Sequence, residues 1–428
     1  MERIQPSKKI RKELNEMING ISGKDFIMSE FFNKAASLIL QELLEKEVTE
    51  YLGRGHYERS HNEVKEDKKK VYRNGYEPLN IKTVEGKIEV EQPQLRNTIK
   101  TYRSKLAAFF KGNTSVLDKL ACEMYARGLS TRDIEDALVD ATGDMLLSRS
   151  SVSKVTDILY EEFELFQNRD LSDHQVEYLF LDAIYESLHK RFGMKQSVLC
   201  AWGITRDGEK VLLHIDLGLR ESYDDWLIFL RDMINRGLPT PTSITSDGAP
   251  GLMKAIDAVF PKSIRIRCWF HRMENFSNKV PIEVWPQIKC ELIHIRDAIN
   301  YEEGKRLACE FIERHKNEYP MLIKAFKDDL TSLLNHLRLP AAHRRAVRTS
   351  NLIERSFEEE RRRTKVIPGF MTEKSGLKLV FATLIRASRT WHKEKFTIFD
   401  INYLDKLRQE LNIDNKKHEN TRAKEETL

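Results

Sequence analysis

The stretch Arg265-Ile266-Arg267-Cys268-Trp269-Phe270-His271 and the earlier run Ser243-Ile244-Thr245-Ser246-Asp247 decide the fold of this chain. Each run is short and closed by side chains that can do chemistry, which is typical of a buried strand that ends at a site. The segment from Leu252 to Phe260 between them has helical spacing, so a strand, helix, strand unit is predicted. Because sites in open α/β sheets form at the carboxyl ends of strands, the polar residues that close the two runs are candidate site residues.

Length and composition indicate a soluble protein of two or three domains. The chain has 428 residues, of which 40% are apolar and 32% charged, and no run approaches the roughly 20 apolar residues that a membrane span needs. The N-terminus has no apolar secretory core and the five cysteines are scattered, so we expect a cytoplasmic protein in a reducing compartment. The net charge of +5 does not by itself establish nucleic-acid binding.

The first hundred or so residues are predicted to hold one long helix and one hairpin. Residues 1–27 are polar and are expected to be poorly ordered, whereas Ser29 to Leu52 has apolar residues at helical spacing and is interpreted as a packing or dimerisation helix. Residues 54–75 form a charged linker. Alternation around Glu85-Gly86 predicts a β-hairpin over residues 79–92.

Residues 116–168 have the pattern of consecutive helices, and two interpretations remain open. A helix ending at Gly128, a second beginning at Ser130 and a third running from Ser148 to about Phe166 resemble a helix-turn-helix DNA reader. Hydroxyls and cations near a helix N-terminus suit phosphates and base edges. A plain helical bundle is the alternative. In the first interpretation the expected DNA contacts are Arg132, Ser148, Arg149, Ser151 and Lys154.

From residue 177 the pattern changes to α/β. Strands are predicted over 178–182, 198–204 and 211–217, followed by a helix from Ser222 to Arg236 and then by the strand, helix, strand unit. This order matches a ribonuclease-H-like fold, a mixed sheet with helices on its faces. Residues 272–346 are predicted to be an all-helical insertion. After it come helices from Asn351 to about Thr364 and after Thr372, and a polar tail beyond Leu411 that is expected to be disordered.

Acids from separate parts of this region are candidates for a metal site. Asp182 is predicted to end the first strand and Asp247 the fourth, and these strand ends are adjacent in the predicted fold. Neighbouring carboxylates repel each other unless a cation neutralises them, and Mg²⁺ prefers such oxygen ligands. On the Asn351 helix the residues alone do not single out Glu354 from Glu358, Glu359 and Glu360. The basic end of this helix supplies further expected DNA contacts, which are Arg361, Arg362, Arg363 and Lys365.

The order of short motifs resembles the Mutator-type transposases of bacterial insertion sequences. The motifs are Leu181-Asp182-Ala183, Ser246-Asp247-Gly248, Arg267-Cys268-x-x-His271 and Thr349 to Arg355, supported by Tyr72 to Tyr76, Tyr319-Pro320 and Arg361 to Thr364. The resemblance runs from about residue 30 to about residue 395. It implies an Asp-Asp-Glu triad on Asp182, Asp247 and Glu354 that holds two Mg²⁺ or Mn²⁺ ions. Ser350 stands where the family usually has Thr.

The signature formed by Cys268 and His271 allows two interpretations. Cys-x-x-His is half of a zinc site, but no second pair at zinc-finger spacing is present, so a complete four-ligand site is not indicated. The interpretation that we favour places His271 among the catalytic groups and gives Cys268 a supporting role.

We therefore predict a DNA transposase of an insertion sequence that binds terminal inverted repeats and target DNA, acts as a homo-oligomer, a dimer, and cleaves and transfers DNA strands. The alternatives are a catalytically silent DNA-binding protein derived from a transposase and a structure-specific nuclease on the same fold. The predicted segments are an N-terminal helical or dimerisation region (1–58), a linker and hairpin (59–112), a helix-turn-helix-like domain (113–170), a catalytic core (171–271 and 347–395), a helical insertion (272–346) and a C-terminal tail (396–428).

Overall fold

The computed structural model folds into two compact units, Met1–Ile158 and Leu159–Leu428, called here the N-terminal and the C-terminal unit. The structure describes residues 4–19, 28–56, 58, 71–98, 102–139, 144–186, 196–218, 221–364, 372–389 and 391–413. The boundary between the units falls inside the 113–170 segment that the sequence suggests as one domain.

The N-terminal unit is built on a β-hairpin that a long helix covers. Strand β1 (Tyr72–Thr83) pairs antiparallel with β2 (Gly86–Arg96), which confirms the predicted hairpin and extends it beyond residues 79–92. Helix α2 (Met28–Leu52) packs along β2, and a two-residue strand, β3 (Gly112–Asn113), adds to β1. The small core between helix and hairpin contains Leu44, Leu79, Ile81, Ile88, Val90 and Ala107.

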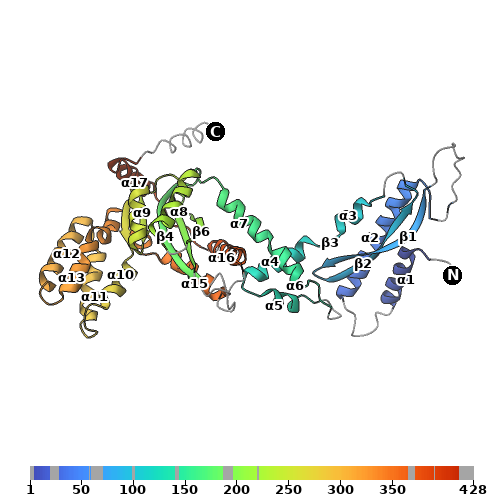
Figure 1. The fold of residues 1–428 in the computed structure, drawn as a ribbon, viewed down its shortest axis with the longest axis horizontal. Coiled ribbons are helices and arrows are strands. Elements are labelled where there is room, and N and C mark those ends of the chain that lie inside the picture. The colour runs from blue at the N-terminus through green and yellow to red at the C-terminus, as the bar shows by residue number, and fades with distance from the viewer. Residues whose placement is uncertain are drawn as a thin grey trace. The chain divides into compact units, whose positions relative to one another are not determined.

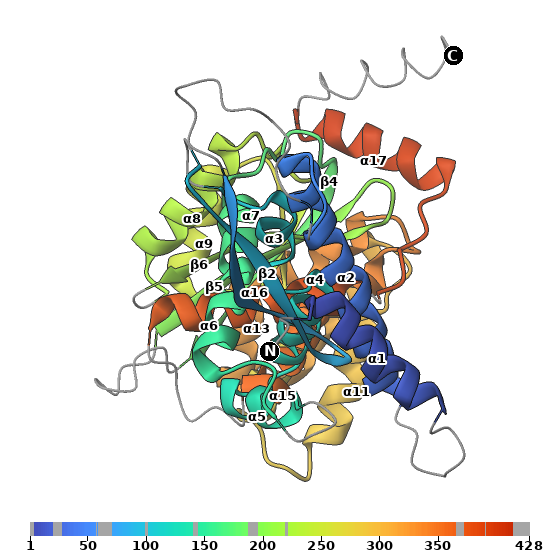
Figure 2. The same cartoon turned by 90° about the vertical axis from the view of Figure 1, so that its right-hand side faces the viewer.

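Helix α1 (Pro6–Asn19) runs beside α2, as Figure 2 shows. The prediction that residues 1–27 are poorly ordered is therefore wrong for this helix. Its start is fixed by Glu45 of α2, whose carboxylate accepts hydrogen bonds from the Ser7 backbone N–H at 3.1 Å and from the Ser7 hydroxyl at 2.6 Å. A polar helix can be stable when a partner of this kind satisfies its free N-terminal N–H groups.

Short helices complete the N-terminal unit. Helices α4, α5 and α6 contact one another, and the short turn predicted by Gly128 joins α4 to α5. Residues 138–148 separate α5 from α6. The predicted continuous helix from Ser148 to Phe166 is wrong, because α6 ends at Thr156 and a separate helix begins at Ile158. The helices are α3 (Lys105–Phe110), α4 (Ser115–Ala126), α5 (Thr131–Ala137) and α6 (Arg149–Thr156).

A five-stranded mixed sheet with the order β6-β5-β4-β7-β8 forms the centre of the C-terminal unit. The first three strands in the chain are antiparallel neighbours, whereas β7 and β8 run parallel to β4. The predicted order of three strands, helix, strand, helix, strand is thus confirmed. The strands are β4 (Val176–Glu186), β5 (Gln196–Thr205), β6 (Lys210–Gly218), β7 (Ser243–Ser246) and β8 (Ile264–Arg267).

Helices lie against this sheet (Figure 1). Helix α8 (Tyr223–Asn235) begins at Ser222, whose side chain and that of Asp225 form a capping box, and α9 (Pro250–Val259) packs against α8. Side chains from both helices and from β4, β5 and β6 form one core that includes Leu181, Leu199, Trp226 and Leu252. Helices α15 (Asn351–Thr364) and α16 (Glu373–Ser388) contact the sheet, α15 at β4 and β5 and α16 at β6.

Residues 268–350, all of which the structure describes, contain no strand and fold around a core of their own that includes Phe276, Leu292, Phe311 and Phe326. This segment leaves and re-enters the sheet region at one place. The Trp269 N–H donates to the Arg348 carbonyl at 3.0 Å, which joins the two ends of the segment. Its helices are α10 (Trp269–Ser277), α11 (Trp285–Arg296), α12 (Tyr301–His315), α13 (Pro320–Leu334), η1 (Asn335–Arg338) and α14 (Arg344–Val347).

The remaining helices of this unit are α7 (Ile158–Asn168) and α17 (Ile398–Glu410). Helix α17 lies in segment 396–428, for which no helix was predicted. The disorder predicted beyond Leu411 falls mainly on residues 414–428, which lie outside the described part. The fully buried Arg408 attaches α17 to the sheet. Its guanidinium donates to the Thr240 carbonyl at 3.1 Å and to the Thr242 hydroxyl at 3.0 Å, and lies 3.7 Å from the buried Glu177 carboxylate.

We expect Arg408→Ala to lower the free energy of unfolding of the C-terminal unit by about 3 kcal/mol, because it removes a partner of the buried Glu177 carboxylate. Urea unfolding followed by tryptophan fluorescence measures this, since all five tryptophans lie beyond residue 158. The matched control is Lys406→Ala on the exposed side of the same helix, which should stay within about 0.5 kcal/mol of wild type. Equal stability of the two variants would contradict the role given to Arg408.

Candidate active site

Two carboxylates lie side by side on neighbouring parallel strands. Leu181 of β4 is paired with Ser246 of β7, so the next residue of each chain segment, Asp182 or Asp247, stands at the same level of the sheet. Each carboxylate is held by a backbone N–H: Ala183 donates to Asp182 Oδ1 at 2.8 Å, and Ala249 donates to Asp247 Oδ1 at 3.0 Å. The prediction that Asp182 ends its strand is wrong, because β4 continues beside β5 to Glu186.

The electrostatics of the pair follow from this placement. Burial first, and the Asp247 carboxylate second, raise the pKa of Asp182 to about 7, and Glu354 adds to the effect. The backbone hydrogen bond from Ala183 and the imidazole of His271 act in the opposite direction. An anion at Asp182 is therefore disfavoured near neutral pH unless a positive charge is added next to the pair.

The backbone after Asp247 requires a glycine. Gly248 has φ of +80°, and a Cβ atom there would fall 0.9 Å from Nη1 of Arg267. The Arg267 guanidinium thus covers this turn at close range, and its Nε lies 3.6 Å from the Asp329 carboxylate of α13. Gly248 both permits the left-handed conformation and leaves room for the arginine.

The third acid, Glu354, is oriented from the start of its own helix. The Ser350 hydroxyl lies 2.7 Å from Glu354 Oε1 and 3.2 Å from the Cys268 sulfur. A hydroxyl has one hydrogen to donate, so Ser350 donates it to either the carboxylate or the sulfur at any one time. The Ser350 N–H also donates to the sulfur at 3.3 Å. Cys268 directly follows β8, so this chain of contacts joins the sheet to α15.

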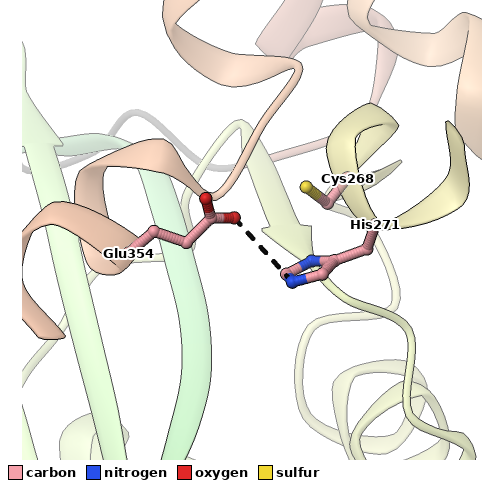
Figure 3. A group of neighbouring side chains, drawn as sticks. All are labelled: Cys268, His271 and Glu354. Atoms are coloured by element: carbon pink, nitrogen blue, oxygen red, sulfur yellow. Dashed lines mark ion pairs between the residues drawn. The ribbon is translucent and has the colours of Figure 1, made fainter. Parts of the chain in front are cut away.

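Cys268, His271 and Glu354 form one cluster, drawn in Figure 3, in which a possible ligand atom of each lies within 4.8 Å of the others. His271 Nε2 is 3.9 Å from Glu354 Oε1. The neighbouring Cys268 sulfur is the main cause that raises the pKa of His271 to about 9, with smaller contributions from Asp182 and Glu354. Burial would raise the pKa of the Cys268 thiol, but the polar groups of His271 and Ser350 outweigh it, and this pKa is lowered.

The predicted DNA contacts on α15 fall into different environments. Arg362 and Arg363 form ion pairs with Glu359, at 2.7 Å in the case of Arg362. Arg361 is exposed and has no ion pair with a carboxylate in the part of the chain that the structure describes. Lys365 lies outside the described residues. Glu358 is exposed on the same side of the helix as Glu354, one turn further on.

The predicted contacts in the N-terminal unit are placed around the start of α6. Ser148 caps this helix by accepting from the Ser151 N–H, and Arg149 is held by Glu135 of α5 through a 2.6 Å ion pair. These three residues therefore have structural partners already. Arg132 and Lys154 are exposed.

Sequence reasoning missed several neighbours of the cluster. Ser350 was noted only as a variant of a motif, although it contacts both Cys268 and Glu354. Glu221 and Tyr185 form a hydrogen-bonded pair near Asp247. Burial first and the Asp247 charge second raise the pKa of Glu221, whereas the pKa of Tyr185 is raised by burial, then by Glu221 and last by Asp247. Neither belongs to a motif. The positive φ of +46° at Glu221 has no signal in the sequence.

Comparison with known proteins identifies the family. The model of the family described as "Transposase, Mutator family" matches residues 9–394. The transposase for insertion sequence element ISRM5 of Rhizobium meliloti is 30% identical over 371 residues, which cover 86% of this chain and 91% of that protein. The transposase for IS406 of Burkholderia multivorans is 31% identical, covering 87% and 92%. The transposase for IS256 in transposon Tn4001 of Staphylococcus aureus is 27% identical, covering 85% and 92%.

This chain therefore belongs to the Mutator family of transposases, as its motifs suggested. Among the described residues, no helix is both long enough and apolar enough to cross a membrane.

We expect purified protein to carry far less than one zinc ion per chain, and Cys268→Ser to fold. The reason is that a structural zinc site takes four protein ligands, whereas this cluster offers three and its sulfur is already hydrogen-bonded to Ser350. Elemental analysis and circular dichroism on wild type and Cys268→Ser measure both points. The interpretation would be contradicted if the wild-type protein held one zinc ion tightly per chain and Cys268→Ser lost both the zinc and the fold.

Proposed function

We propose that this protein is the transposase of an insertion sequence, and that it binds the terminal inverted repeats of the element, cleaves DNA strands there and transfers them to target DNA. The observation that carries the proposal is that Asp182 and Asp247 stand at the same level of neighbouring strands, with Glu354 of α15 near enough for its charge to raise the pKa of Asp182, in a chain of this family. The sheet order and the helical segment between β8 and α15 support a ribonuclease-H-like core with a helical insertion.

The donor set fits hard divalent cations. Asp182 and Asp247 are oxygen ligands in adjacent positions, and their mutual repulsion favours a cation between them. We propose that Asp182, Asp247 and Glu354 hold two Mg²⁺ ions, or Mn²⁺ in their place. Such ions neutralise charge on the phosphate, assist the attacking hydroxyl and stabilise the leaving oxygen.

The remaining groups would orient these acids and the DNA. The backbone N–H groups of Ala183 and Ala249 fix the two aspartates, and Ser350 fixes Glu354. In the proposed reaction His271 donates a hydrogen bond to an oxygen of the scissile phosphate. This hydrogen bond would stabilise the transition state more than the bound substrate. Hydrolysis would free a 3′-OH, which in the second step would attack a phosphodiester of the target DNA.

End recognition is assigned to the helices α4 to α6 of the N-terminal unit, and subunit pairing to its long helix α2. Exposed apolar side chains on α2, among them Phe32, Ile39 and Leu43, are compatible with a partner helix. On this account the protein works on DNA as a dimer.

The triad can be tested on a duplex made from the DNA that flanks the coding region. Asp182→Asn, Asp247→Asn and Glu354→Gln should each lower strand cleavage in Mg²⁺ by at least about a thousandfold, because each removes a charge that acts on the reacting phosphate. End binding, measured by gel shift, should change little. His271→Ala should likewise bind the ends but cleave them poorly.

The matched control is Glu358→Gln, which removes a carboxylate from the exposed neighbouring turn of α15 and should cleave at the wild-type rate. Loss of cleavage in Glu358→Gln together with normal cleavage by Glu354→Gln would show that the third ligand is misassigned. Cleavage that does not depend on the end sequence would favour the structure-specific nuclease. Absence of cleavage by the wild-type protein would favour the silent DNA-binding protein.

Recognition of the ends can be tested separately. Lys154→Ala and Arg132→Ala should each weaken end binding. If the residue contacts a base, the loss should be on the order of 1–3 kcal/mol; if it contacts a phosphate, the dependence of binding on salt concentration should become less steep. Arg149→Ala should instead lower the stability of the N-terminal unit, because it breaks the contact with Glu135. Fluorescence anisotropy and thermal unfolding distinguish the two effects. Unchanged end binding in both Lys154→Ala and Arg132→Ala would contradict this placement of the reader.

A further inference from the structure

A cavity of about 300 Å³ in the C-terminal unit lies beside the first turns of α15 and takes no part in the site described above. It is formed where α14 and α15 approach the edge of the sheet and the segment after α16. Its lining is mostly polar and basic, and includes Lys210, Arg345, Asn351, Arg355, Trp391 and His392.

The charges of this cavity are unbalanced. Lys210 is neutralised by Glu394, whose carboxylate lies 2.8 Å from its Nζ and is the lining's one acidic group. Arg345 and Arg355 are both exposed, and neither forms an ion pair with a carboxylate in the described ranges of the chain. Two guanidinium groups without a counter-charge, on the wall of one cavity, favour an anionic ligand with oxygen acceptors.

The cavity also has an aromatic wall. Trp391 is half-buried and packs on the buried Trp202 of β5, with ring centroids 4.7 Å apart and an interplanar angle of 40°. This contact holds the Trp391 indole in place, so that another face of the ring is offered to the cavity. An aromatic ring of this kind stacks with any nucleobase, because every base has a π-face.

The cavity is placed along the same helix as the proposed triad. Glu354 and Arg355 are consecutive residues of α15, so one side of its first turns carries the proposed metal ligand Glu354 and another side faces the cavity. Ile204 at the cavity pairs with Tyr178 of β4, four residues before Asp182, which corresponds to about 13 Å along the strand. A DNA strand lying at the triad can therefore reach the cavity within a few nucleotides.

We propose that this cavity binds one unpaired nucleotide of the DNA strand, with a phosphate on Arg345 and Arg355 and the base against Trp391. The proposal rests on the proposed DNA-processing function for its substrate. A bare phosphate or sulfate would use the arginines alone, whereas a nucleotide uses the arginines and the indole together. The cavity volume agrees with a ligand of this size, at the lower limit for small-molecule sites.

The test uses full-length protein and a fluorescein-labelled dT15 single strand, with fluorescence anisotropy over a series of salt concentrations. Arg345→Ala and Arg355→Ala should each weaken dT15 binding by about tenfold and make the salt slope shallower by about 0.7, the value for one lost phosphate contact on a single strand. Trp391→Ala should weaken binding by at least about fivefold with the slope unchanged.

Two controls separate a site from general charge and folding effects. Arg231→Ala removes an exposed arginine of α8 that also lacks an ion pair in the described part of the chain, and it should change dT15 binding by less than twofold. Trp391→Phe keeps an aromatic face against Trp202 and should retain most of the affinity. Thermal unfolding of each variant shows whether it is folded.

The outcomes are distinguishable from failure of the triad. Glu354→Gln should bind dT15 like wild type. Whether this variant cleaves DNA tests the triad only, and neither cleavage result affects the cavity proposal. Losses in Arg345→Ala and Arg355→Ala no larger than in Arg231→Ala would overturn the proposal. So would competition by dTMP as effective as that by unlabelled dT15, because the cavity would then be a site for free nucleotides.

Discussion

The repulsion between two carboxylates on adjacent parallel strands is the constraint on which the site depends. The register of β4 and β7 places Asp182 and Asp247 at the same level, where burial and the second charge raise the pKa of Asp182 to about 7. A folded chain tolerates such a pair when a cation or a proton compensates it. The backbone N–H groups at Ala183 and Ala249 hold both acids in place without neutralising them.

The position of Glu354 is also fixed from the sheet, although its helix lies far from the strands in the sequence. Cys268 leaves the sheet after β8, and Ser350 returns to it after the helical segment. Contacts between these two residues and from Ser350 to Glu354 make the geometry of the acid depend on closure of that segment. The hydrogen bond between the Trp269 N–H and the Arg348 carbonyl joins the two ends of this segment, which has a core of its own.

The sequence predicted the order of strands and helices in the C-terminal unit because their periodicity and capping residues are local signals. Choosing Glu354 depended on the family motif, since spacing alone allowed its neighbours. The structure separates them by surroundings: Glu358 is exposed, Glu359 pairs with Arg362 and Arg363, and Glu360 is buried. These differences arise from how α15 packs, which no short stretch of sequence encodes.

The errors have different causes. Helix α17 carries a local signal, the capping box of Thr397 and Asp400, that the sequence prediction did not use, and its attachment is a buried arginine, a residue that ordinarily marks an exposed surface. Helix α1 was missed because Glu45, distant in the chain, caps it. Strand β4 extends past Asp182 because β5 supplies its hydrogen bonds as far as Glu186, beyond the apolar run that a sequence pattern detects.

Iron-directed cleavage of the polypeptide tests most directly whether the three acids form one metal centre. Fe²⁺ can replace other divalent ions at oxygen ligands, and with ascorbate and peroxide it cuts the backbone beside its site. The account predicts cuts next to residues 182, 247 and 354, suppressed by excess Mg²⁺ and absent in Asp247→Asn. Cuts that map elsewhere in the chain, or that persist unchanged in Asp247→Asn, would contradict it.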